Sequence, residues 1–206
     1  EKMKLTRLTD SPILNPIEKN NWEKAAVFNA AAVYHNEKFH MIYRSTDIGG
    51  DDKYGPYINS LGYTTSRDLI HWERNKEPIL RNDVPQELRG PEDPRIVELD
   101  GTFYMTYTGF GNRFPDDYRI CLASSNDLVH WKRHGVVLDE PNKNSSLFPE
   151  KIGGRYCMFH RRHPDIWICY SDDLVNWTDH QMVMSPLPGT WNKTRIGIAG
   201  PPVKLN

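Results

Sequence analysis

The sequence lacks long apolar runs and has almost no net charge. Its 206 residues carry a formal net charge of −1, which gives no general attraction to nucleic acid or to an anionic membrane. No stretch is apolar enough over its length to cross a bilayer, and residues 1–16 lack the apolar core of a signal peptide. We therefore expect a cytoplasmic protein with neither a nucleic-acid nor a membrane partner.

Cysteine is also scarce, with 3 residues in the chain. Cys121, Cys157 and Cys169 form no C-x-x-C pair and show no metal-ligand spacing, so we expect buried, reduced thiols. The sequence also has no phosphate-binding glycine loop, no G-x-G-x-x-G, no His-Glu-x-x-His and no nucleophile elbow. These absences predict a protein with no metal and no cofactor.

What is present is an internal repeat. The segments "TSRDLIHW", "SSNDLVHW" and "YSDDLVNW" begin at Thr65, Ser124 and Tyr170, and each reads Ser-x-Asp-Leu-x-x-Trp. Upstream of each lie two strand-like segments with alternating apolar residues, joined by a turn signal. Four antiparallel strands in each repeated unit are typical of a β-propeller blade.

The repeat predicts an all-β fold formed by a single, incomplete propeller domain over residues 1–206. Its blades are expected at about 26–81, 92–138 and 147–184, with the start of a fourth at about 196–206. A WD-type scaffold is the alternative, but its repeats are shorter, about 40–45 residues, and its Gly-His and Trp-Asp dipeptides do not occur here in repeat register.

The innermost strands of a propeller begin at one mouth of the central channel. Laying "EDPR" over "FNAA" and "FPEK" predicts that Asn29, Asp93, Arg95, Glu150 and Lys151 meet there, with Arg44 and Arg161 at the ends of the second strands. Pro94 disfavours helical geometry at Asp93 and so presents the carboxylate rigidly. The alternative interpretation is that Asp93 and Arg95 only tie blades together through a salt bridge.

The third unit is strongly basic. It contains Lys143, Lys151 and Arg161 among its cations, and such a cluster suits a small oxyanion. A solvated basic edge is the alternative.

Several motifs together resemble glycoside hydrolase family 130: "AVFNAAAV", "YRSTD", "GPEDPRI", "LFPEKI", "HRR" and "AGPPVK". The resemblance implies a five-bladed propeller and inverting phosphorolysis of β-1,2- or β-1,4-mannosides to α-mannose 1-phosphate. It implies Asp93 as the proton donor, acting through a sugar hydroxyl, and Asn29 and Arg44 in the mannosyl site. From their repeat positions, Arg95 and Glu150 are further candidates for substrate binding. It implies that Lys151 and Arg161 hold phosphate, with Lys143 as a weaker candidate.

Two alternatives remain open from the sequence. The first is a hydrolase such as a β-mannosidase, which needs a second carboxylate to activate water, and Glu150 is the candidate. The second is an inactive carbohydrate-binding propeller. The expected partners are a β-mannoside and inorganic phosphate as co-substrate, and a homo-oligomer is compatible with the sequence. Because later blades supply further sugar contacts in the family, we expect weak or no activity from the 206 residues alone.

Overall fold

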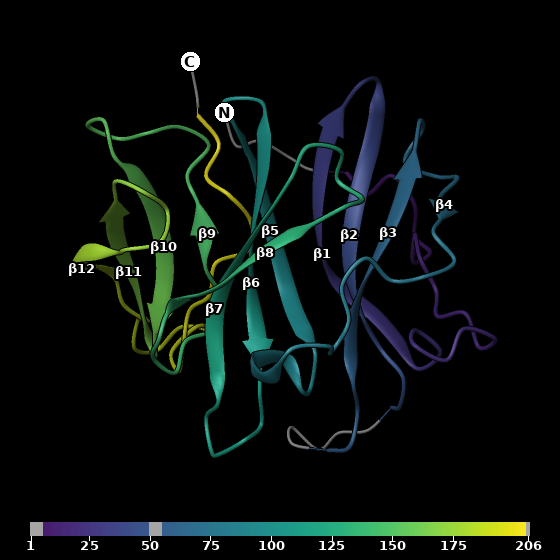
Figure 1. Cartoon of the computed structure of the whole chain (residues 1–206), viewed down its shortest axis with the longest axis horizontal. Coiled ribbons are helices and arrows are strands. Elements are labelled where there is room, and N and C mark those ends of the chain that lie inside the picture. The colour runs from purple at the N-terminus through teal and green to yellow at the C-terminus, as the bar shows by residue number, and fades with distance from the viewer. Residues whose placement is uncertain (1–5, 50–54, 205–206) are drawn as a thin grey trace.

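The computed structural model describes residues 6–49 and 55–204, and these residues form three four-stranded antiparallel sheets. The first sheet contains β1 (Ala26–His35), β2 (Lys38–Thr46), β3 (Asn59–Ser66) and β4 (Glu73–Arg74); the second contains β5 (Pro91–Leu99), β6 (Thr102–Phe110), β7 (Tyr118–Ser125) and β8 (Lys132–Leu138); the third contains β9 (Ser146–Leu147), β10 (Tyr156–Arg162), β11 (Asp165–Ser171) and β12 (Thr178–Met184). The strand order follows the chain in each sheet, and the sheets lie side by side (Figure 1). The prediction of an all-β fold built from repeated four-stranded units is confirmed.

The arrangement is open in the part of the chain that the structure describes. Each sheet uses its first strand, β1, β5 or β9, on the inner side, and no sheet closes on itself. Residues 196–204 contain no strand, although Ile196 N–H donates to the Pro164 carbonyl oxygen at 3.4 Å. The remainder of the predicted fourth blade, residues 205 and 206, and the first five residues of the predicted domain lie outside the described residues.

Helix is almost absent, as the patterning indicates. One 3₁₀ turn, η1 (Pro85–Glu87), precedes the second sheet, in a segment whose sequence favours a turn or two of helix. No helix among the described residues is long and apolar enough to cross a membrane.

The Ser-x-Asp-Leu-x-x-Trp repeat is a turn that joins the third strand to the fourth. In the second sheet, Asp127 Oδ1 accepts the backbone N–H groups of Val129 and His130 at 2.9 and 2.8 Å. Leu128 has a φ of +66°, and its carbonyl oxygen accepts the indole N–H of Trp131 at 3.0 Å. The other two copies repeat this bonding through Asp68 and Asp173. The turn therefore fixes how the chain passes from the third strand to the outer strand of each sheet.

Two apolar cores lie between adjacent sheets. The first contains Ile42 and Leu61 from the first sheet together with Met105 and Ala123 from the second. The second core packs residues such as Val97 and Leu122 against Met158 and Cys169 of the third sheet. The three cysteines are buried free thiols, and Cys121 and Cys169 pack as small apolar side chains in these cores.

Candidate active site at the starts of the inner strands

Asn29 and Asp93 occupy the same position in two neighbouring sheets. The register of β1 against β2 shifts between Phe28 and Ala31, and that of β5 against β6 shifts between Glu92 and Arg95. Inside these bulges Asn29 and Asp93 have φ values of +46° and +52°, a left-handed conformation that Asn and Asp tolerate better than most residues. A bulge re-aims the side chain that it carries. As a result, Asn29 Nδ2 donates a hydrogen bond to Asp93 Oδ1 at 2.8 Å.

Arg44 binds two carboxylates of the second sheet, those of Glu92 and Asp93. It lies on β2 opposite Phe28, and its Nη1 and Nη2 donate to Asp93 Oδ1 at 3.1 Å and to Glu92 Oε1 at 2.8 Å. Its Nε donates to Asn59 Oδ1 at 2.8 Å, and Asn59 Nδ2 donates to Glu92 Oε1 at 2.9 Å. The guanidinium also stacks over the Phe28 ring, with 4.6 Å to the ring centre. One arginine thus fixes the orientation of two buried acids.

Lys143 brings a second cation from the segment that precedes β9. Its ammonium contacts the Glu92 carboxylate and lies 3.5 Å from Asp93 Oδ2. Asp93 is 6% exposed, whereas the Lys143 side chain is 29% exposed. The lysine therefore forms the wetter side of the site and remains accessible to a small anion.

The pKa of Asp93 records the balance between burial and charge. Burial by itself would raise the pKa, but Lys143 and Arg44, together with the hydrogen bonds from Asn29 and Arg44, outweigh it and hold the pKa below the ordinary value for aspartate. Asp93 is therefore a carboxylate at neutral pH in the ligand-free protein. A proton-donating role requires that some of this positive charge be neutralised or displaced.

Arg161 and Arg95 lie at the same end of the sheets. Arg161 lies near the end of β10 as Arg44 lies near the end of β2. Burial lowers the pKa of Arg161, while the charge of Asp93 acts in the opposite direction, so the two groups are within electrostatic range. Arg95 Nη2 donates to the Ile198 carbonyl oxygen at 3.3 Å, and its buried Nε makes no hydrogen bond within the described residues. The segment after β12 therefore returns to the inner strands beside this site.

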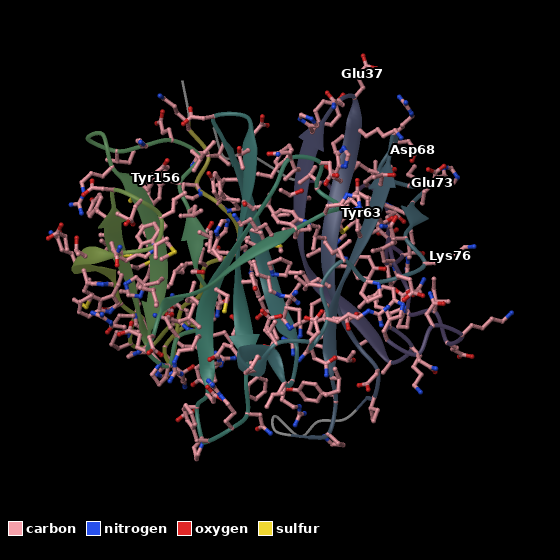
Figure 2. The ribbon with its side chains drawn as sticks, viewed as in Figure 1. Glu37, Tyr63, Asp68, Glu73, Lys76 and Tyr156 are labelled. Carbon is pink, nitrogen blue, oxygen red and sulfur yellow. The ribbon has the colours of Figure 1, made fainter. Side chains whose placement is uncertain are left out.

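Glu150 and Lys151 are not brought to Asp93, so the predicted alignment of "FPEK" with "EDPR" is wrong. Both residues lie beyond β9, in the hairpin that leads to β10, at the opposite end of the inner strand. Glu150 is exposed and pairs with Lys204 at 2.9 Å, and the Lys151 ammonium lies 4.3 Å from the Tyr156 ring centre. Tyr156, which contacts Lys151, lies in the upper half of the view, as does Glu37 in the hairpin of the first sheet (Figure 2). Apolar Phe148 suggested the wrong register because it matches Phe28.

The pairing of β9 gives the correct register. Leu147 and Ser146 pair with Met158 and Phe159, as Ile96 and Arg95 pair with Met105 and Thr106. Asn144 is therefore the counterpart of Asp93 and Asn29, and its φ of +75° agrees with theirs. Lys143 in turn takes the place of Glu92.

Sequence reasoning missed three polar residues of this site. Asn144 was detectable, because "NSSL" matches "NAAA" once an Asn or Asp is required at a left-handed position. Glu92 is part of the aligned segment "EDPR", but the sequence pattern gives it no role. Asn59 carried no signal, because its position opposite Arg44 depends on how β3 pairs with β2.

Together, repeated four-stranded sheets with a polar, charged site at their inner strand starts define a β-propeller-like protein. The chain belongs to glycoside hydrolase family 130, because the family model described as β-1,4-mannooligosaccharide phosphorylase matches residues 1–206.

Curated relatives from Thermoanaerobacter sp. (strain X514) support this assignment. A 1,2-β-oligomannan phosphorylase is 61% identical over 202 residues, and a β-1,2-mannobiose phosphorylase is 52% identical over 208 residues. Each match covers 98% of this chain and 68% of the relative.

Solved structures show the same fold. One belongs to a study of family 130 mannoside phosphorylases that describes glycoside hydrolases targeting β-1,2-mannosidic linkages in Candida mannan. It superposes with a TM-score of 0.84 at 29% identity, over 95% of this chain and 65% of that chain. The present chain thus spans slightly less than two thirds of the solved protein.

Proposed function

We propose that this chain is part of an inverting β-mannoside phosphorylase, with β-1,2-linked manno-oligosaccharides as the favoured substrates and β-1,4-linked ones as the alternative. We further propose that its three sheets are blades of a five-bladed propeller, for which the greater length of the relatives leaves room. The observation that carries the function is the site itself: Asp93 is held by Asn29 and Arg44 of the neighbouring sheet, with Lys143 beside it.

In the proposed reaction Asp93 is the general acid. Its proton passes, through a hydroxyl of the bound sugar, to the glycosidic oxygen as the C–O bond breaks. An oxygen of inorganic phosphate attacks the anomeric carbon from the opposite face, so a new C–O bond forms with inversion and gives α-mannose 1-phosphate. Phosphate brings its own nucleophilic oxygen, and the protein therefore needs no second carboxylate as a base.

Lys143 and Arg161 are proposed to hold the phosphate, and Asn144 is a further candidate donor. Phosphate binding at Lys143 offsets the charge that most strongly opposes protonation of Asp93. The pKa of Asp93 then rises, because burial by itself favours the neutral acid. Phosphate binding would thus favour the protonated form of Asp93, which couples binding of the co-substrate to proton transfer.

Hydrolysis is the second candidate, because family 130 includes hydrolases of β-1,2-mannosides. It would require a free carboxylate to activate water. Glu150 lies beyond β9, and Glu92 is occupied by Arg44, Asn59 and Lys143. The geometry therefore favours phosphorolysis.

Product analysis tests the proposal. The protein that carries these residues is incubated with β-1,2-mannobiose or β-1,4-mannobiose, with and without phosphate. We expect α-mannose 1-phosphate from the β-1,2 substrate only when phosphate is present. Free mannose without phosphate would establish a hydrolase, and sugar binding without turnover would establish a binding module. Either result would overturn the proposal.

A further inference from the structure

The first two sheets share one arrangement, which we call the latch: a buried glutamate that accepts hydrogen bonds from a tyrosine and an arginine. In the first sheet, buried Glu23 accepts hydrogen bonds from Tyr43 Oη at 2.7 Å and Arg74 Nη1 at 3.1 Å. In the second, buried Glu87 accepts them from Tyr107 Oη at 2.7 Å and from Arg133 Nη2 at 3.0 Å. The latch ties the segment before each inner strand to the second and fourth strands of that sheet.

The third sheet has a pair of histidines in place of the latch. His160 stands on β10 where Tyr43 and Tyr107 stand on β2 and β6. His180 lies on β12 three residues after Trp177, as His134 lies three residues after Trp131, and its Nδ1 is 2.9 Å from His160 Nε2.

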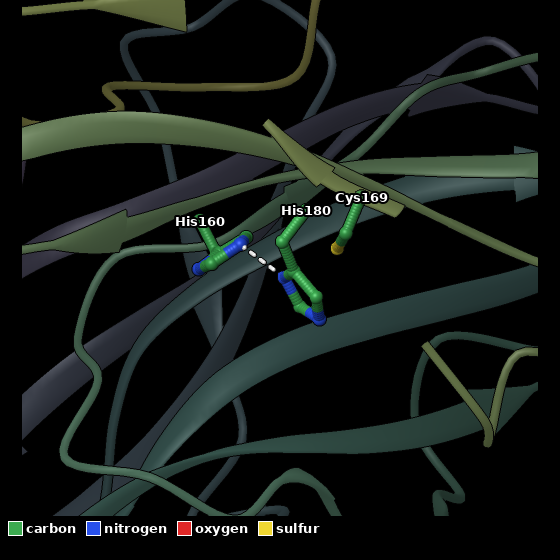
Figure 3. Close-up of side chains that lie close together, drawn as sticks. All are labelled: His160, Cys169 and His180. Carbon is green, nitrogen blue, oxygen red and sulfur yellow. Dashed lines mark hydrogen bonds between the residues drawn. The ribbon is translucent and has the colours of Figure 1, made fainter. Parts of the chain in front are cut away.

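The third member of the cluster comes from β11. Cys169 pairs with Met158, as Ala123 pairs with Met105 in the second sheet. The ligand atoms of His160, Cys169 and His180 all lie within 4.8 Å of one another, and Figure 3 shows the three side chains converging.

We propose that His160 Nε2, His180 Nδ1 and Cys169 Sγ bind a divalent cation of the zinc type, with water as a fourth ligand. Two imidazoles and one thiolate are typical zinc ligands, at about 2.0–2.1 Å for nitrogen and about 2.3 Å for sulfur. The two nitrogens are 2.9 Å apart and share a hydrogen bond. Tetrahedral zinc separates such nitrogens by about 3.3 Å, so a small rotation of the rings lets the cation replace the shared proton.

The hydrogen bonds of His160 define what binding requires. Its Nδ1 accepts a hydrogen bond from Asn142 Nδ2 at 2.9 Å, while Glu140 pairs with Arg162 and lies 3.9 Å from that nitrogen. When Nε2 binds the cation, the ring proton moves to Nδ1, and the Asn142 amide turns so that its Oδ1 accepts this proton.

Burial and charge are compatible with the site. His160 and Cys169 are fully buried. The nearby cation Arg162 is paired with Glu140 at 2.9 Å and stacked over Trp167. A thiolate formed on binding offsets further positive charge.

The site lies between the second and third sheets, and its role would be structural. Asn142 contacts His160 and directly precedes Lys143, so the cation would order the segment that carries Lys143 into the candidate active site. The metal proposal rests on the cluster alone and stands whether or not the chain is a phosphorylase.

Metal binding by the chelator-treated 206-residue chain tests the proposal. We expect a single Zn²⁺ per chain by native mass spectrometry and a rise in Tm of about 5 °C with excess zinc. Replacement by Co²⁺ should give a thiolate-to-cobalt charge-transfer band.

Two variants, each at a fully buried cysteine, locate the site. Cys169→Ala places the residue that the second sheet already carries as Ala123, so the fold should be retained while the zinc response is lost. Cys121→Ala removes a buried thiol from the second sheet and should keep the response. The proposal is overturned if the parent chain shows no charge-transfer band with Co²⁺, or if Cys169→Ala responds to zinc as the parent does. The cobalt spectrum decides the matter even where a variant fails to fold.

Discussion

At the scale of single residues, the candidate site depends on Asp93 in a conformation that few side chains adopt. Its φ of +52° and the bulge around it direct the carboxylate to Asn29 and Arg44. Local strain of this kind persists where the surroundings fix it and is common at functional sites. Burial and positive charge act on the same carboxylate in opposite directions, which makes its protonation sensitive to whatever binds Lys143.

Asp93→Asn tests the acid directly. The substitution is nearly isosteric but removes the proton that is transferred, so we expect turnover to fall by about 10²–10⁴-fold while the circular dichroism spectrum is unchanged. Initial-rate assays with saturating phosphate measure the effect. Turnover close to that of the parent protein would remove Asp93 from the role of general acid.

The lowered pKa of Asp93 also predicts a dependence of stability on pH. A carboxyl group whose pKa is lower in the folded protein stabilises the fold above its unfolded pKa of about 3.9, and this contribution is lost as pH falls through the folded value. Asp93→Asn should therefore be less stable than the parent at neutral pH and should lose less stability on acidification.

Urea unfolding between about pH 3 and pH 7 measures this difference. The exposed Asp139, whose carboxylate pairs with Arg119 at 2.9 Å, provides the control variant Asp139→Asn. Identical acid dependence of the parent and Asp93→Asn would show that the site does not favour the ionised carboxylate.

At the scale of elements, each sheet is finished by the same turn. The aspartate in this turn accepts two backbone N–H groups, as a helix N-cap does. Burial alone would raise the pKa of Asp127, but its hydrogen bonds outweigh burial and lower the pKa, so the ionised carboxylate is favoured. The sequence repeat therefore reflects a repeated set of backbone hydrogen bonds and not repeated functional residues.

Asp127→Ala is expected to lower the free energy of unfolding by about 1 kcal/mol, because two backbone donors lose their partner. The neighbouring Asn126 is exposed, and Asn126→Ala should change stability by less than about 0.5 kcal/mol. Chemical denaturation of both variants measures the difference. Equal stability of the two would show that the turn is held by other contacts.

At the scale of the whole molecule, adjacent sheets are held together by the two apolar cores. Met105 and Met158 occupy equivalent positions on β6 and β10, and both are fully buried, whereas Met182 on β12 is 55% exposed. The three sheets should therefore depend on each other for stability rather than unfold independently.

Truncation of either buried methionine tests this dependence. Met105→Ala and Met158→Ala should each reduce the free energy of unfolding by about 2–5 kcal/mol, while Met182→Ala should have little effect. Denaturant unfolding followed by tryptophan fluorescence and by circular dichroism should show a single shared transition in each variant. Separate transitions for the two probes would mean that the sheets fold as independent units.

Sequence patterning predicted the three sheets, because they follow from periodicity and from repeat positions. Asp93, Asn29 and Arg44 lie together as predicted, since they are on strands whose register the first two repeats define. Lys151 and Glu150 were misplaced because β9 is short and the apolar match of Phe148 outweighed the match of Asn144. Contacts such as that of Asn59 with Arg44, and the cluster around Cys169, depend on strand pairing and bulges that spacing along the chain does not encode.

The central claim is that the starts of neighbouring inner strands form one site in which Lys143 accepts phosphate beside Asp93. Comparison of the KM for phosphate in Lys143→Gln and Lys151→Gln tests it most directly, because both remove one lysine charge from the same unit of the chain. We predict that Lys143→Gln raises this KM about 10-fold or more and that Lys151→Gln leaves it unchanged. An unchanged KM in Lys143→Gln together with a raised KM in Lys151→Gln would contradict the account.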